Sequence, residues 1–370
     1  MSKHGRVLVA MSGGIDSSVT AVLLHEAGYE VIGLTMKTWD YASSGGEKKE
    51  TGCCSLDSIH DARDIAVRLG FPHYIFDIRE EFNESVIDYF VAEYLAGRTP
   101  NPCIVCNTYI KWNALLKRAD KLGCEFIATG HYANVRTENN RHIISKGVDN
   151  QKDQSYVLWG LSQESLTRTL FPMGKFLKTE IRQMASQMGF QSLVNKSESY
   201  EICFIPDNDY RGFIGRRNPE AINQLSEGNF VTTDGRVVGT HQGYPYYTIG
   251  QRKGIVAMGE PYYVVQIIPE SNTVIIGKEA DLYNNSLLVK KLNLVKYQTI
   301  PEKLPVNTKI RYRDRGSYSI VSQQNEQEAL VYFAEPVKSI TPGQAAVFYE
   351  GDDVVGGGWI SLTKAQIKKV

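Results

Sequence analysis

The sequence predicts an α/β protein with a doubly wound parallel sheet, followed by a small mixed or β-rich central domain and a C-terminal region of short strands. Up to about residue 206, apolar strand-like runs alternate with helical patterns, which is typical of parallel βαβ units. A glycine turn joins the first strand to the first helix. Beyond residue 206, short β-like runs separated by turn residues replace the long helices.

The composition limits the class of protein. The 370 residues suggest two or three domains, and the balance of 41 basic and 41 acidic residues argues against a protein that coats nucleic acid. No apolar run approaches the ~20 residues of a membrane span, and the first strand begins too early for a secretory signal. Six cysteines in so long a chain do not form a disulfide framework. We expect a cytoplasmic monomer without a membrane partner.

Individual elements follow from hydrophobic periodicity. In the first half we predict strands at 7–10, 30–36, 73–77 and 126–130, and helices at 57–69, 81–96 and 109–122. In the second half we predict β-like runs at 230–235, 262–268, 273–276, 287–294, 309–312, 318–321, 329–333 and 345–349. The pair Asp234-Gly235 predicts a hairpin, and the evenly spaced last strands favour a small barrel or sandwich. The predicted domains are 1–206, 207–280 and 281–370.

The turn after the first strand has the composition of a phosphate-binding loop. Ser12-Gly13-Gly14 lies between a strand and a helix, an arrangement that gathers backbone N–H groups and the positive end of a helix dipole around one anion. No lysine follows the glycines, so the loop is poorly equipped to hold a departing γ-phosphate. We expect a pyrophosphate that stays bound while the α-phosphate is attacked. Met36 and Gly130 end neighbouring predicted strands and should border the same pocket, although Met36 could equally be a core residue.

The cysteines supply a second chemical signal. Cys103 and Cys106 form a Cys-x-x-Cys motif just before a predicted helix, where a thiol has a lowered pKa. This position favours a redox or sulfur-handling role. The alternatives are two inert cysteines or half of a zinc site, for which no second Cys-x-x-Cys exists. Cys124 and Cys203, each considered alone, have the character of buried core cysteines, and we assign no role to Cys53 and Cys54.

The loop 12–17 resembles the SGGxDS motif of the PP-loop ATP pyrophosphatase superfamily, whose fold is adenine nucleotide α-hydrolase-like. This resemblance implies ATP with Mg²⁺ as cofactor, adenylation of a substrate and release of pyrophosphate. The residues expected to bind the nucleotide are Ala10, Met11, Ser12, Gly13, Gly14, Ile15, Asp16, Ser17, Met36 and Gly130.

Further stretches make the resemblance more specific. They are 97–107, 129–132, 152–156, 199–205, 247–254, 309–313, 341–344 and 356–358. Together with the loop, these unusual strings in fixed order closely resemble the bacterial-type tRNA-specific 2-thiouridylases almost from end to end. The resemblance implies an N-terminal PP-loop domain, a central adaptor domain and a C-terminal β-barrel that contacts tRNA.

The resemblance also implies the reaction, that of a tRNA-uridine 2-sulfurtransferase. ATP adenylates the C2 oxygen of the wobble uridine, position 34, in the tRNAs for Lys, Glu and Gln, and sulfur then displaces AMP to give 2-thiouridine. Cys203 accepts a persulfide from a sulfur-donor protein, either a cysteine desulfurase or a sulfur relay. Cys106 is the second catalytic thiol, which attacks the terminal sulfur or resolves the reaction as a Cys106–Cys203 disulfide.

One position departs from the family pattern. Many members have aspartate where this chain has Cys103, and a thiol with a reference pKa of about 8.5 is a different acid. As an alternative mechanism, Cys103, Cys106 and Cys203 could ligate three irons of a [4Fe–4S] cluster whose fourth iron binds sulfide.

Contacts to tRNA are implied by the same resemblance. The matching residues are Asn101, Pro102, Cys103, Lys152, Asp153, Gln154, Arg311 and Tyr312. From the residues alone, Arg311 and Arg313 in a strand beside Tyr312 would combine phosphate contacts with stacking, whereas the alternative is a solvated strand face. His131 either borders the nucleotide or is structural. Two rival functions stay open: a PP-loop synthetase that adenylates a small molecule without thiols, and a non-catalytic RNA-binding protein with ATP as a structural ligand.

Overall fold

The structure is a computed structural model that describes residues 3–39, 56–196, 202–225 and 227–361. Cys53 and Cys54 lie outside the described residues. Contacts divide the chain into two compact units, each described by itself. The first comprises Met1–Ile87, Cys103–Asp209 and Asp352–Val354, and the second comprises Asp88–Pro102, Tyr210–Gly351 and Val355–Val370. Within the described ranges, no helix has the length and apolar character needed to cross a membrane.

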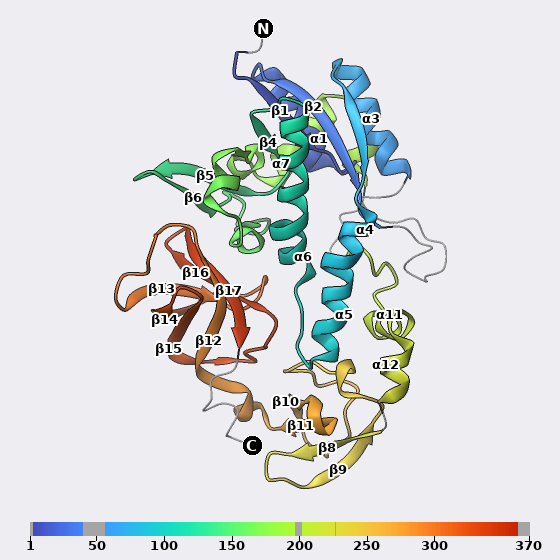
Figure 1. Ribbon diagram of the computed structural model, residues 1–370, viewed down its shortest axis with the longest axis vertical. Coiled ribbons are helices and arrows are strands. Elements are labelled where there is room, and N and C mark those ends of the chain that lie inside the picture. The colour runs from blue at the N-terminus through green and yellow to red at the C-terminus, as the bar shows by residue number, and fades with distance from the viewer. Residues whose placement is uncertain (1–2, 40–55, 197–201, 226, 362–370) are drawn as a thin grey trace. The chain divides into compact units, whose positions relative to one another are not determined.

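A five-stranded parallel sheet organises the first unit (Figure 1). Its order is β3-β2-β1-β4-β7, and every neighbouring pair is parallel. The strands are β1 (Arg6–Ala10), β2 (Glu30–Lys37), β3 (His73–Asp77), β4 (Phe126–Ala128) and β7 (Thr169–Leu170). This order confirms the predicted parallel sheet, and only the two-residue strand β7 is new. Because the strands run parallel, the carboxyl ends of β1, β2 and β4 share one edge.

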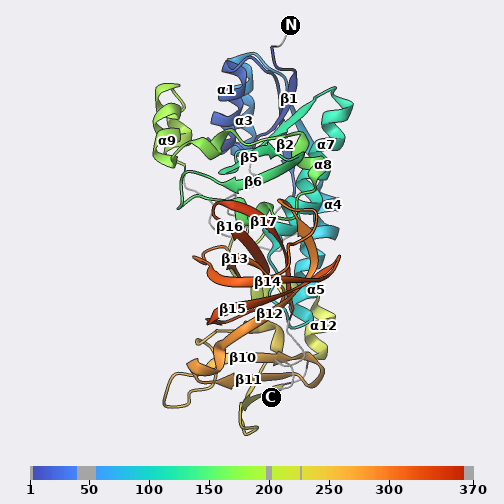
Figure 2. The same cartoon turned by 90° about the vertical axis from the view of Figure 1, so that its left-hand side faces the viewer.

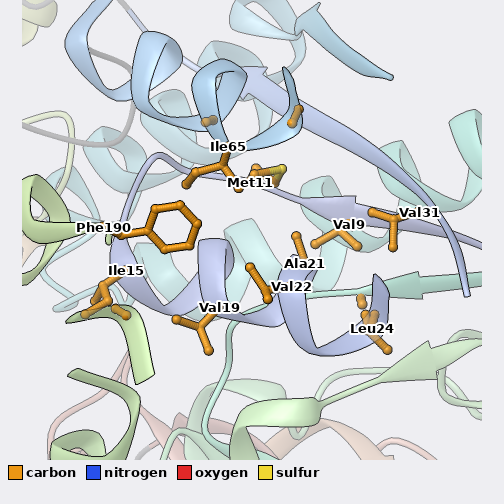
Figure 3. Close-up of a cluster of buried hydrophobic side chains, with 14 of the residues drawn as sticks. Val9, Met11, Ile15, Val19, Ala21, Val22, Leu24, Val31, Ile65 and Phe190 are labelled. Carbon is orange, nitrogen blue, oxygen red and sulfur yellow. The ribbon is translucent and has the colours of Figure 1, made fainter. Parts of the chain in front are cut away.

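One core cluster ties helices to β1. Figure 3 shows Val9 and Met11 of the β1 segment among apolar side chains of α1 (Ile15–Glu26) and α3 (Leu56–Leu69), together with Phe190. Ile181 and Ala185 of α9 (Lys178–Gln187) belong to the same cluster, whereas α7 packs against β1 and β4. Other elements of this unit are α4 (Arg79–Phe82), β5 (Ala133–Glu138), β6 (Arg141–Lys146), α8 (Gln163–Thr167) and α10 (Gln191–Val194).

A helical stretch of three consecutive segments carries Cys103 and Cys106. It consists of α6 (Pro102–Val105), a π-helical turn (Cys106–Lys111) and α7 (Trp112–Lys121). The prediction that both cysteines precede the helix is therefore wrong, because the helix begins at Pro102. Proline is tolerated in a first helical turn, where its missing N–H has no intrahelical partner. A second π-helical turn (Asn83–Ile87) separates α4 from α5 (Asp88–Leu95), within the helix predicted at 81–96.

The second unit contains a four-stranded sheet of order β10-β11-β8-β9. Its strands are β8 (Gly228–Thr232), β9 (Val237–His241), β10 (Tyr263–Ile268) and β11 (Thr273–Gly277). The predicted hairpin is confirmed, since β8 and β9 are antiparallel and Gly235 adopts φ +86° in their turn. Two helices precede this sheet, α11 (Tyr210–Arg217) and α12 (Pro219–Gln224).

A six-stranded barrel completes the second unit, in orange to red in Figures 1 and 2. Its strands are β12 (Tyr283–Leu294), β13 (Leu304–Lys309), β14 (Ser317–Asn325), β15 (Glu328–Lys338), β16 (Ala345–Glu350) and β17 (Asp353–Ser361). Pairing of β12 with β17 closes the sheet on itself, so the chain forms a barrel and not a sandwich.

The strand predicted at 309–312 is wrong. β13 ends at Lys309, and Arg311 and Tyr312 lie in the turn before β14. The Asp314 carboxylate forms this turn, because it accepts hydrogen bonds from the backbone N–H groups of Ile310 at 3.0 Å and Gly316 at 3.1 Å. The alternation of apolar and polar residues from 309 to 313 imitates a strand, but side chain to backbone bonds favour the turn.

Glycines at 356–358 allow the barrel to close. A Cβ added to Gly356 would lie 2.4 Å from the carbonyl oxygen of Asn293, and one added to Gly358 would lie 2.4 Å from Cγ1 of Val289. Strand β17 therefore approaches β12 more closely than any side chain would permit.

We predict that Gly356→Ala destabilises the protein by about 1–3 kcal/mol, because the new methyl group meets a backbone oxygen that cannot rotate away. Thermal unfolding followed by circular dichroism measures the change. Gly215→Ala is the matched control, since its Cβ would meet no atom within 4 Å and its position in α11 favours alanine. Equal melting midpoints for Gly356→Ala and the wild type would contradict this account of barrel closure.

Candidate active site

The Ser17 hydroxyl makes hydrogen bonds at two points of the loop between β1 and α1. Ser17 Oγ accepts a hydrogen bond from the Ser12 N–H at 3.0 Å and donates one to the Gly14 carbonyl at 3.1 Å. Gly14 is the N-cap of α1, and among the described residues no side chain caps this helix. The first N–H groups of α1 therefore face the loop, where an anion is stabilised by the helix dipole.

Two other segments pack against the loop backbone. Gly13 adopts φ +65°, and a Cβ on it would lie 1.9 Å from the carbonyl oxygen of Ser58 in α3. Gly130 follows β4, and a Cβ there would lie 2.8 Å from the backbone nitrogen of Ser17. The structure thus brings Gly130 against the loop. Met36 is half-buried near the end of β2, where it pairs with Phe76 of β3.

The residues at the end of β1 connect the loop to the sheet. Ala10 is half-buried, and Met11 is 2% exposed. The Met11 N–H donates to the Leu34 carbonyl of β2 at 2.8 Å, and the Thr35 hydroxyl donates to the Met11 carbonyl at 2.8 Å. Both bonds fix where the chain leaves the sheet and enters the loop.

Asp16 is the focus of polar contacts in the first unit. Lys178, at the start of α9, places Nζ 2.7 Å from each carboxylate oxygen, and its own side chain is 8% exposed. The Tyr132 hydroxyl donates to Asp16 Oδ1 at 2.7 Å. No local sequence pattern marks Lys178 or Tyr132 as a partner of Asp16, because 162 and 116 residues separate them from it. A buried cation is therefore held at a loop that has no lysine of its own.

The stretch 152–154 holds the Tyr132 backbone through hydrogen bonds from Gln154. Gln154 Oε1 accepts from the Tyr132 N–H at 3.0 Å, and the Gln154 N–H donates to the Tyr132 carbonyl at 2.9 Å. The Asp153 carboxylate is buried and accepts from the N–H of Gly147 at 3.3 Å and of Ser155 at 3.1 Å. Lys152 is half-buried. The side chains of Asp153 and Gln154 thus accept hydrogen bonds from backbone N–H groups and fix the backbone next to the loop.

The four described cysteines lie in different surroundings. Cys106 is 7% exposed and opens the π-helical turn, whereas Cys203 is half-buried and directly followed by the buried side chains of Phe204 and Ile205. Cys103 is exposed, but the protein atoms around its sulfur raise the pKa of the thiol by desolvation, against the opposing effect of the Lys111 charge.

Burial shifts the pKa of two other titratable groups. Burial raises the pKa of Cys124 to about 11, which confirms its core character. Burial, with a smaller effect from Lys111, lowers the pKa of His131 to about 3. Its Nδ1 lies 2.8 Å from the Thr129 hydroxyl, and its ring lies against Trp112. His131 is therefore a neutral imidazole at physiological pH.

The described residues contain no group of three or more His, Cys, Asp or Glu side chains arranged to hold a metal ion. Cys103, Cys106 and Cys203 are therefore not gathered as a ligand set in this structure, and the cluster alternative gains no support from it.

In the second unit, hydrogen bonds join residues 99–100 to Thr248 and to residues 342–344, which are far apart in sequence. The Thr99 N–H donates to the Pro342 carbonyl at 2.9 Å. Gln344 Nε2 donates to the carbonyls of Thr99 at 2.9 Å and Pro100 at 3.1 Å, and the Thr99 hydroxyl donates to the Thr248 hydroxyl at 3.3 Å. These bonds fix the chain that enters Asn101 and Pro102.

The turn of Arg311 and Tyr312 is exposed on the barrel, with Tyr312 40% exposed. Tyr318, early in β14, is 62% exposed. Arg311 and Arg313 thus lie in a solvent-exposed turn that also carries Tyr312, and not on a strand face.

Comparisons with known proteins agree along the chain. Family profiles described as the tRNA methyl transferase HUP domain, the tRNA methyl transferase PRC-barrel domain and the aminomethyltransferase beta-barrel domain match residues 5–207, 219–278 and 284–360. The chain is 64% identical over 369 residues to the tRNA-specific 2-thiouridylase MnmA of Cytophaga hutchinsonii, covering 99% of this chain and 100% of the relative.

Two further relatives carry the same name. That of Amoebophilus asiaticus is 63% identical, covering 98% of this chain and 97% of the relative. That of Salinibacter ruber is 56% identical, with coverage of 97% and 95%. Identity of this extent over the full length of each chain shows common descent, so the chain belongs to the family of tRNA-specific 2-thiouridylases named MnmA.

Proposed function

We propose that this chain is a tRNA-specific 2-thiouridylase, an ATP-dependent sulfurtransferase that acts on the wobble uridine of the tRNAs for Lys, Glu and Gln. The observation that carries the proposal is the phosphate loop whose Asp16 is held by Lys178 and Tyr132, in a chain 64% identical over its length to an enzyme of that name. A sulfur-donor protein, a cysteine desulfurase or a sulfur relay, supplies the sulfur.

In the adenylation step, the loop N–H groups hold the pyrophosphate portion of ATP while the uridine C2 oxygen attacks the α-phosphate. Lys178 stabilises charge that builds up on the phosphates, because a fixed cation in a water-poor site needs no reorganisation. Asp16 is partly exposed, and carboxylate oxygens are ligands that Mg²⁺ prefers. When bound there, Mg²⁺ would neutralise phosphate charge.

In the sulfur step, the terminal sulfur of a Cys203 persulfide attacks C2, and the C2–O bond breaks to release AMP. The Cys106 thiolate then attacks the Cys203 sulfur, so that the persulfide S–S bond breaks and 2-thiouridine is released. A Cys106–Cys203 disulfide remains, and an external dithiol must reduce it. Cys103 keeps its proton at neutral pH because its pKa is raised, so it acts as a neutral donor toward the base where a carboxylate could not.

The remaining assignments follow from the same reasoning. We propose domain limits at 1–206, 207–280 and 281–370, a monomer, and residence in the reducing cytoplasm. Base and tRNA contacts are proposed for Asn101, Pro102, Cys103, Lys152, Asp153, Gln154, Arg311 and Tyr312.

The function is tested by anaerobic thiolation of unmodified tRNA-Glu. Iron-depleted wild-type protein with ATP and a persulfide donor is expected to form 2-thiouridine, measured by mass spectrometry. Cys106→Ser and Cys203→Ser should form none, because each lacks one of the two sulfur atoms that exchange bonds. Cys124→Ala, a change at a buried thiol outside the site, is the matched control and should keep activity.

Three results would count against this proposal. Product only after iron and sulfide are restored would favour the cluster mechanism. Product from both mutants would exclude the thiol route, and pyrophosphate release with a small-molecule acceptor alone would favour a different PP-loop synthetase.

Lys178→Met should slow tRNA-dependent pyrophosphate release by about 100-fold, the effect typical of losing one charge-stabilising donor. Binding of tRNA, measured by filter retention, should stay unchanged. Lys175→Met, at an exposed lysine of the preceding turn, is the control. A Lys178→Met enzyme with normal pyrophosphate release would remove Lys178 from the adenylation step.

Arg311→Ala should weaken tRNA binding and lower its salt dependence by about one counterion, with ATP affinity unchanged. Titrations of labelled tRNA at several salt concentrations measure both quantities. Arg236→Ala, at an exposed arginine of the β8–β9 turn, is the control. Equal loss of tRNA and ATP affinity would refute a direct phosphate contact.

A further inference from the structure

A second lysine reaches the phosphate loop from outside it. The Lys196 ammonium lies 3.1 Å from the Gly13 carbonyl oxygen, 2.9 Å from Ser58 Oγ and 2.9 Å from Asp61 Oδ2. An ammonium has three N–H donors, and these three acceptors use all of them. Ser58 and Asp61 both belong to α3, so one cation joins α3 to the loop. This bond spans 183 residues of sequence.

The bond to Gly13 has a directional consequence. A trans peptide is planar, so the Gly13 carbonyl and the Gly14 N–H point in opposite directions. When the carbonyl is held toward Lys196, the Gly14 N–H must point to the other side of the loop. Gly14 is the N-cap of α1, and N–H groups at this position are among those that bind an anion at a helix N-terminus.

Gly13 needs such a restraint. It adopts φ +65° and has no Cβ, so the peptide planes on either side of it are free to rotate over a wide range. The close approach of the Ser58 carbonyl blocks a side chain at Gly13 but offers no hydrogen-bond donor to the Gly13 carbonyl. Lys196 supplies that donor, and Ser58 and Asp61 fix the ammonium that does so.

We infer that Lys196 is a positioning residue of the phosphate site, whose ammonium holds the Gly13 carbonyl and thereby directs the Gly14 N–H toward the pyrophosphate portion of bound ATP. The inference rests on the proposed use of ATP. It assigns Lys196 a role distinct from that of Lys178, which pairs with the carboxylate of Asp16 and lies 8% exposed. Lys196 acts on the loop backbone and is 34% exposed.

Equilibrium binding of ATP and of AMP to the full chain tests the inference. Lys196→Met should raise the Kd for ATP about tenfold, because a misdirected N–H forfeits one charge-assisted hydrogen bond. The Kd for AMP, which lacks the pyrophosphate, should change less than twofold. Lys196→Arg keeps a donor for the carbonyl and should restore most of the ATP affinity. Lys121→Met, at an exposed lysine of α7, is the control.

The variant Asp61→Asn distinguishes a Lys196 that positions the loop from a Lys196 that binds the phosphate directly. If Lys196 positions the loop, this variant keeps the bond to Gly13, and the Kd for ATP should change less than threefold. Severalfold tighter ATP binding would mean that Asp61 restrains an ammonium that binds phosphate directly, which overturns the inference. An unchanged Kd for ATP in Lys196→Met, or equal losses for ATP and AMP, would overturn it as well.

The same measurements keep the inference distinct from the proposed function. The variants could change the Kd for ATP as expected while the wild-type protein forms no 2-thiouridine. That result would contradict the proposed function and support the role of Lys196. Thiolation by the wild type with no effect of Lys196→Met on ATP binding would do the reverse.

Discussion

The left-handed turn at Gly13 is the constraint on which the catalytic unit depends. Its φ of +65° and the Ser58 oxygen, 1.9 Å from where a Cβ would be, leave room for glycine alone. Because the turn is this tight, β1 passes directly into α1, and the helix N-terminus opens at the carboxyl edge of the sheet. Gly130, which follows β4, lies against the start of α1, where a Cβ would meet the Ser17 nitrogen at 2.8 Å. Two lysines complete the site: Lys196 holds the Gly13 carbonyl, and Lys178 pairs with the Asp16 carboxylate.

The sequence predicted much of this because the signals are local. Strands β1 to β4, helix α3 and the hairpin at Gly235 each follow from a run of fewer than twenty residues. The helical stretch begins at Pro102, earlier than the predicted start at residue 109, because proline fits a first helical turn. The turn at Arg311 was missed because an alternating pattern outweighed the capping carboxylate of Asp314.

The parts of the site that sequence reasoning could not find are long-range. Lys178, Tyr132 and Lys196 join the loop across more than a hundred residues, and a single lysine or tyrosine carries no local pattern that marks such a partner. Burial is equally hidden. It separates the exposed Cys103 from the buried Cys106, three residues apart in one helical stretch, and it lowers the pKa of His131 to about 3.

The hydrogen bonds from the barrel to residues 99–100 affect how such a chain can evolve. Gln344 and Pro342 hold the backbone immediately before Asn101 and Pro102. An appended domain is usually exchangeable, because only a linker joins it to its neighbour. Here, replacing the barrel would also remove the anchor of a segment that enters the cysteine helix. Domain shuffling at this junction would therefore be selected against, and the barrel and that helix should be inherited together.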